Sequence, residues 1–226
     1  IHAEIWATDT ISADLPPMVE FKKKADKIIK DRYGVEVEHI CAKKTQMQSL
    51  TYEDIFYRKY KKNKDRIYGF PMIKGQWCTG ELKRSAVKKS LAPKGVTNQV
   101  IQYLGIASDE PKRIARHIKK PNIILPLVEI GWDEAYCRKW CEENNLLSPI
   151  YTTTTRGGCW FCHNQSVDQL RLLQKNYPEY WQLLLKWDTD SPVPFKADGH
   201  TVHDYDRRFM QEDLGIVPKD RTFRWK

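Results

Sequence analysis

The stretch Gly157-Gly-Cys-Trp-Phe-Cys162 constrains the architecture of this chain more than any other part of the sequence. Two cysteines separated by two residues can bind one metal ion from a single tight turn. The glycines just before them allow the backbone to fold closely around such an ion. The pair therefore predicts a metal site to which cysteines from elsewhere in the chain contribute.

Four more cysteines are available as ligands. Cys137 and Cys141 lie four residues apart in a helix expected over 132–144, so both project from the same face of that helix. Cys78 lies in a basic turn over 77–84, whereas Cys41 has no partner pattern. Spacing alone favours Cys137 as the fourth ligand. The alternative is that all six cysteines are ordinary buried thiols.

The bulk composition indicates one large domain, or one domain with an appendage, able to build a hydrophobic core. The chain has 226 residues, of which 41% are hydrophobic, and it contains eight tryptophans. No run approaches ~18 apolar residues and no signal peptide is visible, so no membrane partner is expected. Six cysteines with motif-like spacing predict reduced thiols in the cytoplasm.

A net charge of +9 indicates an anionic partner, either a polyanion such as nucleic acid or a phosphate-rich small ligand. The alternative is a well-solvated surface, which is what most lysine runs form. The positive charges gather in five clusters: 22–24, 58–66, 83–89, 112–120 and 219–226.

Strand-like and helix-like segments alternate along the chain, which predicts an α/β fold with a mostly parallel sheet covered on both faces. Strands are expected over 2–8, 35–40, 99–106 and 123–128. Helices are expected over 16–32, 80–91, from Pro111, and over 132–144, 167–174 and 178–187. Residues 42–76 are polar and weakly periodic, and they indicate a long excursion over the active face.

Ligands of parallel sheets bind beyond the carboxyl ends of the strands, where three polar segments are expected: 8–10, 78–84 and 105–113. Lys83 and Arg84 lie in the first turn of a predicted helix, where positive charge opposes the helix dipole. Together with the free backbone N–H groups of that turn, they predict a bound anion. The alternative is a partly exposed surface turn.

Five segments, taken in order, resemble the phosphoadenosine-phosphosulfate (PAPS) reductase family within the adenine nucleotide α-hydrolase-like, or ATP pyrophosphatase, superfamily. The resemblance covers about residues 1–190 and is closest to bacterial and phage-type members. The segments are Trp6-Ala-Thr-Asp-Thr10, Trp77-Cys-Thr-Gly-Glu-Leu-Lys83, Gly105-Ile-Ala-Ser-Asp-Glu-Pro-Lys-Arg113, Leu127-Val-Glu-Ile-Gly-Trp132 with Cys141, and Gly158-Cys-Trp-Phe-Cys162.

The resemblance implies a Rossmann-like, three-layer, mostly parallel sheet over 1–130, with adenylate across the strand ends, and a cysteine-rich, metal-stapled, mainly helical part over 131–226. It implies that Zn²⁺ or a 4Fe–4S cluster is bound by Cys78, Cys141, Cys159 and Cys162. His163, which follows Cys162 directly, is an alternative ligand by its position in the sequence. The implied nucleotide- or anion-binding residues are Asp9, Thr79, Lys83, Arg84, Gly105, Asp109 and Arg113.

Two family motifs are missing from the 226 residues. The phosphate-binding Ser-Gly-Gly-Lys-Asp-Ser loop would precede Ile1, so we expect it upstream or lost. No cysteine follows Cys162, so the reductases' C-terminal nucleophile is absent and a true reductase is disfavoured. We therefore expect an enzyme that binds ATP or a sulfonucleotide and performs adenylation or sulfur transfer, with no catalytic nucleophile assigned.

A function of another class is a metal-stabilised nucleic-acid-binding module, alone or as part of a nucleic-acid modification system. Tyr52, Tyr57, Tyr60 and Tyr68 alternate with lysine and arginine within 42–76. Such a composition can stack on bases and contact phosphates. A lid over a nucleotide or a plain solvated loop would have the same composition.

Overall fold

The computed structural model describes residues 2–4, 13–72, 76–91, 101–152, 157–220 and 223. Asp9 and the rest of the 6–10 motif lie outside these ranges. The longer helices are α1 (Pro16–Tyr33), α6 (Glu134–Glu143), α7 (Val167–Asn176), α8 (Pro178–Asp190) and α9 (Val202–Asp213). The shorter ones are α2 (Tyr52–Phe56), the π-helix η1 (Cys78–Arg84), α3 (Ser85–Leu91), α4 (Pro111–His117), α5 (Pro126–Glu129) and the 3-10 helix η3 (Pro149–Thr152).

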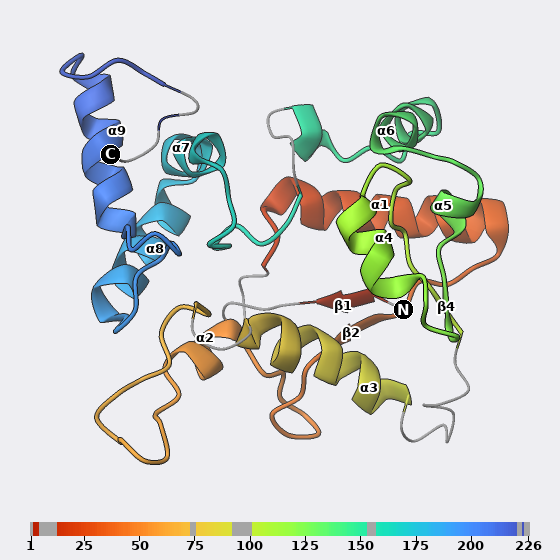
Figure 1. Ribbon diagram of the computed structural model, residues 1–226, viewed down its shortest axis with the longest axis horizontal. Helices are drawn as coiled ribbons and strands as arrows, with labels where there is room; N and C mark the ends of the chain where they lie inside the picture. The colour runs from red at the N-terminus through yellow and green to blue at the C-terminus, as the bar shows by residue number, and fades with distance from the viewer. Residues whose placement is uncertain are drawn as a thin grey trace.

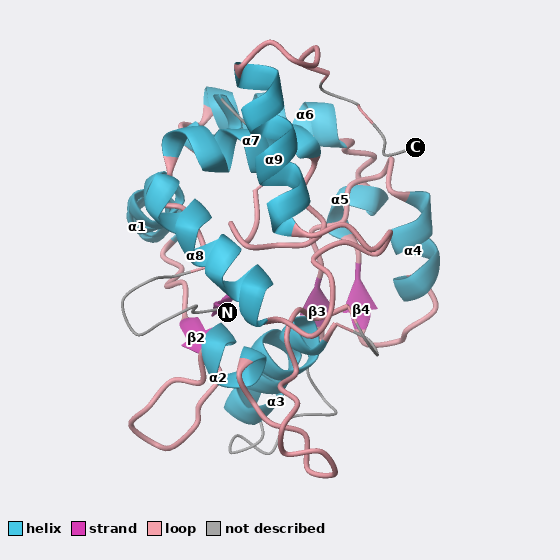
Figure 2. Ribbon diagram, turned by 90° about the vertical axis from the view of Figure 1, so that its left-hand side faces the viewer, coloured by secondary structure: helices cyan, strands magenta, loops and turns pink. Residues whose placement is uncertain are grey.

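Strands contribute little to the described part of the chain. β1 (His2–Glu4) pairs in parallel with β2 (His39–Cys41), and β3 (Gln102–Tyr103) pairs in parallel with β4 (Ile123–Ile124). In Figure 1, β1 and β2 lie between α1 and α3, while α7, α8 and α9 gather at the other end of the molecule. Figure 2 shows β3 and β4 as a pair separate from β2.

The predicted three-layer, mostly parallel Rossmann-like sheet is therefore wrong for the residues described here. They form two separate sheets of two strands each, and no strand exceeds three residues. The strand expected over 123–128 stops after Ile124 because Pro126 cannot donate a hydrogen bond and begins α5 instead. The strand expected over 35–40 begins only at His39, and Val35 is 53% exposed.

The boundaries of the helices follow local sequence chemistry more closely than those of the strands do. Pro16 and Pro17 open α1, and Gly34 ends it with φ +65°, where its N–H bonds the Lys30 carbonyl oxygen. α2, α7 and α9 each begin with a capping box, in which the N-cap side chain and the side chain three residues later satisfy each other's backbone N–H groups. The predicted helices over 16–32, 132–144, 167–174 and 178–187 are thus confirmed, with small shifts at their ends.

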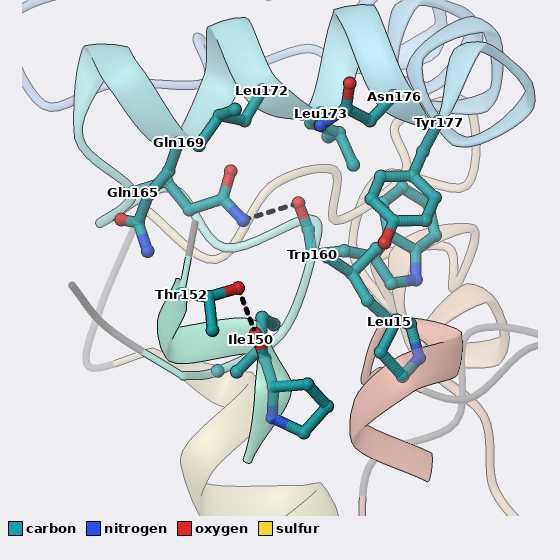
Figure 3. Close-up of a pocket in the computed structure, with 13 residues that line it drawn as sticks. Leu15, Ile150, Thr152, Trp160, Gln165, Gln169, Leu172, Leu173, Asn176 and Tyr177 are labelled. Carbon is teal, nitrogen blue, oxygen red and sulfur yellow. Dashed lines mark hydrogen bonds between the residues drawn. The ribbon is translucent and has the colours of Figure 1, made fainter. Parts of the chain in front are cut away.

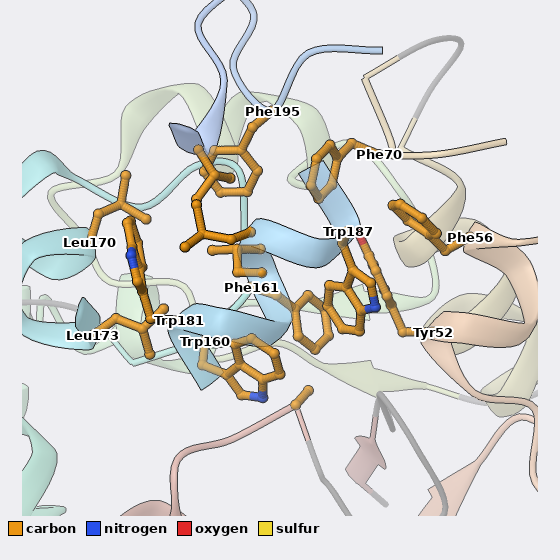
Figure 4. Close-up of a cluster of buried hydrophobic side chains, with 14 of the residues drawn as sticks. Tyr52, Phe56, Phe70, Trp160, Phe161, Leu170, Leu173, Trp181, Trp187 and Phe195 are labelled. Carbon is orange, nitrogen blue, oxygen red and sulfur yellow. The ribbon is translucent and has the colours of Figure 1, made fainter. Parts of the chain in front are cut away.

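The main core is an aromatic cluster between α2, the cysteine turn at 159–162, α8 and α9, and not the face of a sheet. Figure 4 shows Tyr52, Phe161, Trp160 and Trp187 along one line of this cluster. Trp160 stacks on Trp187 with 5.4 Å between ring centroids and an interplanar angle of 18°. Large buried aromatic rings contribute most to core stability per residue. The chain therefore uses its tryptophans to pack helices against the cysteine turn.

A buried ion-pair network joins α7 to α9. The Glu212 side chain is 1% exposed and accepts hydrogen bonds from Arg171 and Arg208. Arg171 also donates to Asp168, 2.8 Å away, at the start of α7.

Within the described residues, no helix has the length and apolar character needed to cross a membrane.

Candidate metal and anion site

A cavity of about 250 Å³, here called the thiol pocket, brings together three cysteines from two distant parts of the sequence. Cys78 lies at the start of η1, and Cys159 and Cys162 lie in the turn before α7. Lys83 and Thr79 line the same cavity from η1. The remaining lining residues are Gln76, Gly157, Gly158, His163, Asn164, Gln165 and Gln169.

The cysteine turn is tightly organised by its own backbone. Gly158 has φ +151°, a conformation that residues with side chains rarely adopt, so the glycine permits entry into the turn. The Cys162 N–H then donates to the Cys159 carbonyl oxygen over 3.0 Å. Trp160 and Phe161 point into the core and are 1% and 3% exposed. Burial of the two central residues fixes the direction of the cysteines on either side of them.

Side chains from outside the turn hold it in place. The Gln165 side-chain amide donates to the carbonyl oxygens of Cys159 and Trp160, over 3.1 and 2.7 Å. Lys196, from the segment before α9, donates to the carbonyl oxygens of His163 and Gln165. Burial lowers the pKa of Lys196 to about 8. The backbone on both sides of Cys162 is therefore anchored by polar contacts as well as by the aromatic core.

The π-helix η1 places Cys78 and Lys83 on one side. In an α-helix, residues five apart point about 140° away from each other. A π-helix bonds residues five apart instead, as in the bond from the Ser85 N–H to the Gly80 carbonyl oxygen. Gln76, two residues before Cys78, has the uncommon φ of +51°. An irregular helix after a positive-φ residue is a frequent feature of functional sites.

The three cysteines are half-buried, and Lys83 lies close enough to Cys78 and Cys159 to affect their pKa values. Burial raises the pKa of Cys159 to about 12, an effect that Lys83 partly opposes. Burial also raises the pKa of Cys78, as does the charge of Cys162, while Thr79 and Lys83 act in the opposite direction. Thiolates in this pocket thus need further cationic stabilisation, of the kind that a bound metal ion would supply.

Tyr52 does not line the pocket but packs behind the cysteine turn, in the aromatic core. Its ring contacts Phe161, Trp77 and Trp187, with centroids 4.2, 4.8 and 5.1 Å away. Its hydroxyl is buried and has no hydrogen-bond partner among the described residues. Burial raises the pKa of Tyr52, as do the charges of Cys78, Cys159 and Cys162. A buried O–H donor without an acceptor, beside three thiols, fits a site that holds negatively charged sulfur.

The donor chemistry fits a thiolate-bound metal, although the sulfur atoms are not gathered around one point. Among the described residues, no three His, Cys, Asp or Glu side chains are close enough to coordinate a single ion. Cysteine ligands of one zinc ion lie about 2.3 Å from the metal, so they must converge closely. Cysteines that bind a cluster attach to different iron atoms and can stand further apart.

Cys141, the fourth predicted ligand, does not line the thiol pocket. It lies on α6, where burial and the neighbouring Cys137 raise its pKa. Cys41 contacts the Ser49 hydroxyl, with 3.1 Å between sulfur and oxygen. His163 does line the pocket and is 9% exposed. The structure therefore brings together three of the four predicted ligands and the predicted alternative.

The predicted anion-binding residues separate into two groups. Thr79 and Lys83 line the thiol pocket, whereas the neighbouring Arg84 does not. Gly105, Asp109 and Arg113 do not line it either: Asp109 accepts a hydrogen bond from the Glu134 N–H at the start of α6, and Arg113 pairs with Glu110.

A second, mainly apolar cavity of about 260 Å³ adjoins the thiol pocket. The two share Gly158, Gln165 and Gln169 as common walls. Figure 3 shows Leu15, Trp160 and Tyr177 on one side of this cavity and Gln165 with Gln169 on the other. The Gln165 side-chain oxygen is buried and has no hydrogen-bond partner among the described residues. A ligand at Lys83 therefore has room for a larger apolar portion next to it.

Comparisons of the chain with protein-family models, with curated proteins and with solved structures found no match. The resemblance to the PAPS reductase family is thus carried by the motif residues alone, and the function that it implies stays a prediction.

Sequence reasoning missed three residues that shape the site. Tyr52 was expected on a stacking surface, yet it is 1% exposed. The capping box of Thr51 and Asp54 was the signal that placed it on a helix with Ile55 and Phe56. Gln165 and Lys196 act through bonds to backbone carbonyls, and such bonds leave no pattern in the sequence.

Proposed function

We propose that the protein is a sulfur- or adenylyl-transferring enzyme that binds an adenine nucleotide, either ATP or a sulfonucleotide, beside a metal centre held by thiolates. The observation that carries the proposal is the convergence of Cys78, Cys159, Cys162 and Lys83 on one cavity. Three thiols and a lysine combine ligands for a soft metal with a donor for phosphate or sulfate oxygen.

Each residue has a distinct part in this proposal. Cys78, Cys159 and Cys162 hold the metal, and the fourth ligand is Cys141, as the resemblance implies, or His163, which lines the pocket. When bound, a zinc ion supplies a structural link between η1 and the cysteine turn, and a 4Fe–4S cluster supplies electron or sulfur chemistry. Lys83 and Thr79 bind and orient the anionic end of the nucleotide.

Metal analysis tests the first half of the proposal. The protein is purified without oxygen, and zinc, iron and sulfide are measured per chain together with the absorbance spectrum. Cys78→Ser, Cys159→Ser and Cys162→Ser are each expected to lose most of the metal. Cys137→Ser, which changes a cysteine on α6 outside the pocket, is the matched control and is expected to keep it.

Nucleotide binding tests the second half, with two adjacent cations as a matched pair. Lys83 lines the thiol pocket and Arg84 does not, although both are exposed residues of η1. We expect Lys83→Gln to weaken binding of labelled ATP or a sulfonucleotide by about tenfold, as for a charge-assisted bond of about 1.4 kcal/mol. Arg84→Gln is expected to have little effect. Equal losses in both variants would contradict the assignment of Lys83.

A further inference from the structure

A basic hairpin, residues 58–68, projects between α2 and η1 as a surface feature distinct from the thiol pocket. Lys59 and Ile67 form an antiparallel bridge at its base, and the Tyr60 N–H donates to the Arg66 carbonyl oxygen over 3.0 Å. The Tyr68 N–H donates to the Arg58 carbonyl oxygen over the same distance. The structure therefore presents this part of the 42–76 excursion as an ordered hairpin with an exposed tip at 61–66.

The hairpin concentrates positive charge that the rest of the described chain neutralises only at Arg58. The hairpin contains one carboxylate, that of Asp65, and six positively charged side chains. These are Arg58, Lys59, Lys61, Lys62, Lys64 and Arg66. Arg58 pairs with Glu81 over 2.7 Å, whereas the four lysines make no ion pair with any described residue. Like charges held on one short hairpin repel each other, so an anionic ligand would relieve the repulsion.

Two tyrosine rings that contact each other lie among these positive charges. The rings of Tyr60 and Tyr68 lie 4.6 Å apart between centroids, at an interplanar angle of 40°. The Arg66 guanidinium lies over the Tyr60 ring and that of Arg58 over the Tyr68 ring, at 5.8 and 5.5 Å. Tyr52 and Tyr57 do not belong to this group, because Tyr52 is buried and the Tyr57 hydroxyl bonds Asp190.

We propose that the basic hairpin binds single-stranded nucleic acid, with phosphates on the lysines and a base stacked on the tyrosine pair. Aromatic rings beside backbone-tracking cations are the usual elements of such sites. A membrane surface fits less well, because the tip at 61–66 has no apolar side chain to enter a bilayer. An acidic protein would use the charges but would leave the tyrosine–arginine arrangement without a role.

An ion pair connects the hairpin to the helix that carries Cys78 and Lys83. Arg58 at its base pairs with Glu81, which lies on η1 between Cys78 and Lys83. The hairpin also follows α2 directly, and α2 begins at Tyr52. Binding to nucleic acid needs neither the metal nor the nucleotide, so this proposal stands or fails separately from the proposed function.

The test measures binding of the whole chain to labelled 12-residue single-stranded DNA and RNA and to a DNA duplex, from 50 to 200 mM salt. Lys61→Gln with Lys62→Gln removes two charges from the tip, and Lys23→Gln with Lys24→Gln removes two exposed charges from α1 as the matched control. If both tip lysines contact phosphates, the slope of log affinity against log salt falls by about 1.4 in the hairpin variant alone. Equal losses in the two variants would show general attraction by net charge and overturn the proposal.

Tyr60 tests the stacking contact. Tyr60→Phe keeps the ring and is expected to bind single strands like the unchanged protein, whereas Tyr60→Ala is expected to lose about tenfold in affinity, within the usual range for one stacked base. Unchanged thermal unfolding of both variants confirms that the fold is intact. Equal affinities of Tyr60→Ala and Tyr60→Phe, equal binding of duplex and single strands, or no binding at 50 mM salt would each overturn the proposal.

Discussion

The ring of Tyr52 packs against the ring of Phe161 with 4.2 Å between centroids, the shortest centroid separation among the described aromatic pairs. Phe161 lies between the two cysteines of the turn, and Tyr52 is the first residue of α2. Through this contact, the polar excursion after β2 packs against the cysteine turn that lines the thiol pocket. The Tyr52 hydroxyl is thereby held in a buried place beside sulfur atoms, where it meets no described hydrogen-bond acceptor.

Tyr52→Phe removes that hydroxyl and keeps the packing of the ring. In the metal-free protein we expect the free energy of unfolding to stay the same or rise by up to about 1 kcal/mol, because an unsatisfied buried hydroxyl is unfavourable. In the metal-loaded protein we expect the affinity for metal to fall by about 10- to 100-fold, as when a hydrogen bond to a ligand is lost.

Urea unfolding and competition with a chelator measure the two quantities for Tyr52→Phe. Tyr60→Phe, which removes a hydroxyl from the basic hairpin, is the control and should change neither. A loss of more than about 1 kcal/mol in the metal-free Tyr52→Phe protein would show that the hydroxyl already has a partner there.

Glu212→Gln removes the one carboxylate that both Arg171 and Arg208 contact from α7 and α9. The Glu212 side chain is 1% exposed and the two arginines are 20% exposed. The variant therefore takes from Arg208 its carboxylate partner and leaves Arg171 with Asp168 alone. We expect the free energy of unfolding to fall by about 2–4 kcal/mol. Glu143→Gln breaks an exposed pair with Lys139 and should change it by less than about 0.5 kcal/mol.

Tryptophan fluorescence during urea unfolding measures both glutamate variants, because Trp181 and Trp187 lie in the core beside α9. Similar small losses in Glu212→Gln and Glu143→Gln would show that the α7–α9 contact is held by packing alone.

Asp204 gives a stability contribution that depends on pH. Its carboxylate accepts a hydrogen bond from the Thr201 N–H at 3.0 Å, and this bond lowers the pKa of Asp204 below its ordinary value. A carboxyl group with a lowered pKa in the folded state stabilises the fold above its unfolded pKa of about 3.9, and this stabilisation is lost as the pH falls through the folded pKa.

Asp204→Asn is therefore expected to be less stable than the unchanged protein at pH 7, with a difference that shrinks below about pH 4. Thermal unfolding measured between pH 7 and pH 3 gives the difference directly. A gap between the two proteins that stays constant over this range would mean that the charge of Asp204 does not contribute.

The sequence predicted the helices better than the sheet, and the reason is physical. Helix ends are marked by local chemistry, as at Pro16 and Gly34 of α1 and at Ser166 of α7. Strand pairing depends on neighbours that are distant in sequence, and a short apolar run such as 123–128 fits a strand or a buried turn equally well. Pro126 was the local signal against a long strand there.

The candidate site was partly predictable. The resemblance favoured Cys78 over Cys137, and the structure places Cys78, and not Cys137, beside Cys159 and Cys162. Helical spacing alone would have chosen Cys137, because spacing describes one helix and says nothing of what packs against it. The alignment of Cys78 with Lys83 depends on the π-helical hydrogen bonds of η1, which no residue pattern marks.

The most direct test is the metal content per chain of the oxygen-free protein and its cysteine variants. The unchanged protein and Cys137→Ser should each carry one metal centre, and Cys78→Ser, Cys159→Ser and Cys162→Ser should each carry almost none. Comparing Cys141→Ser with His163→Gln then identifies the fourth ligand. Metal that persists in Cys78→Ser but disappears in Cys137→Ser would contradict the assignment of the thiol pocket as the metal site.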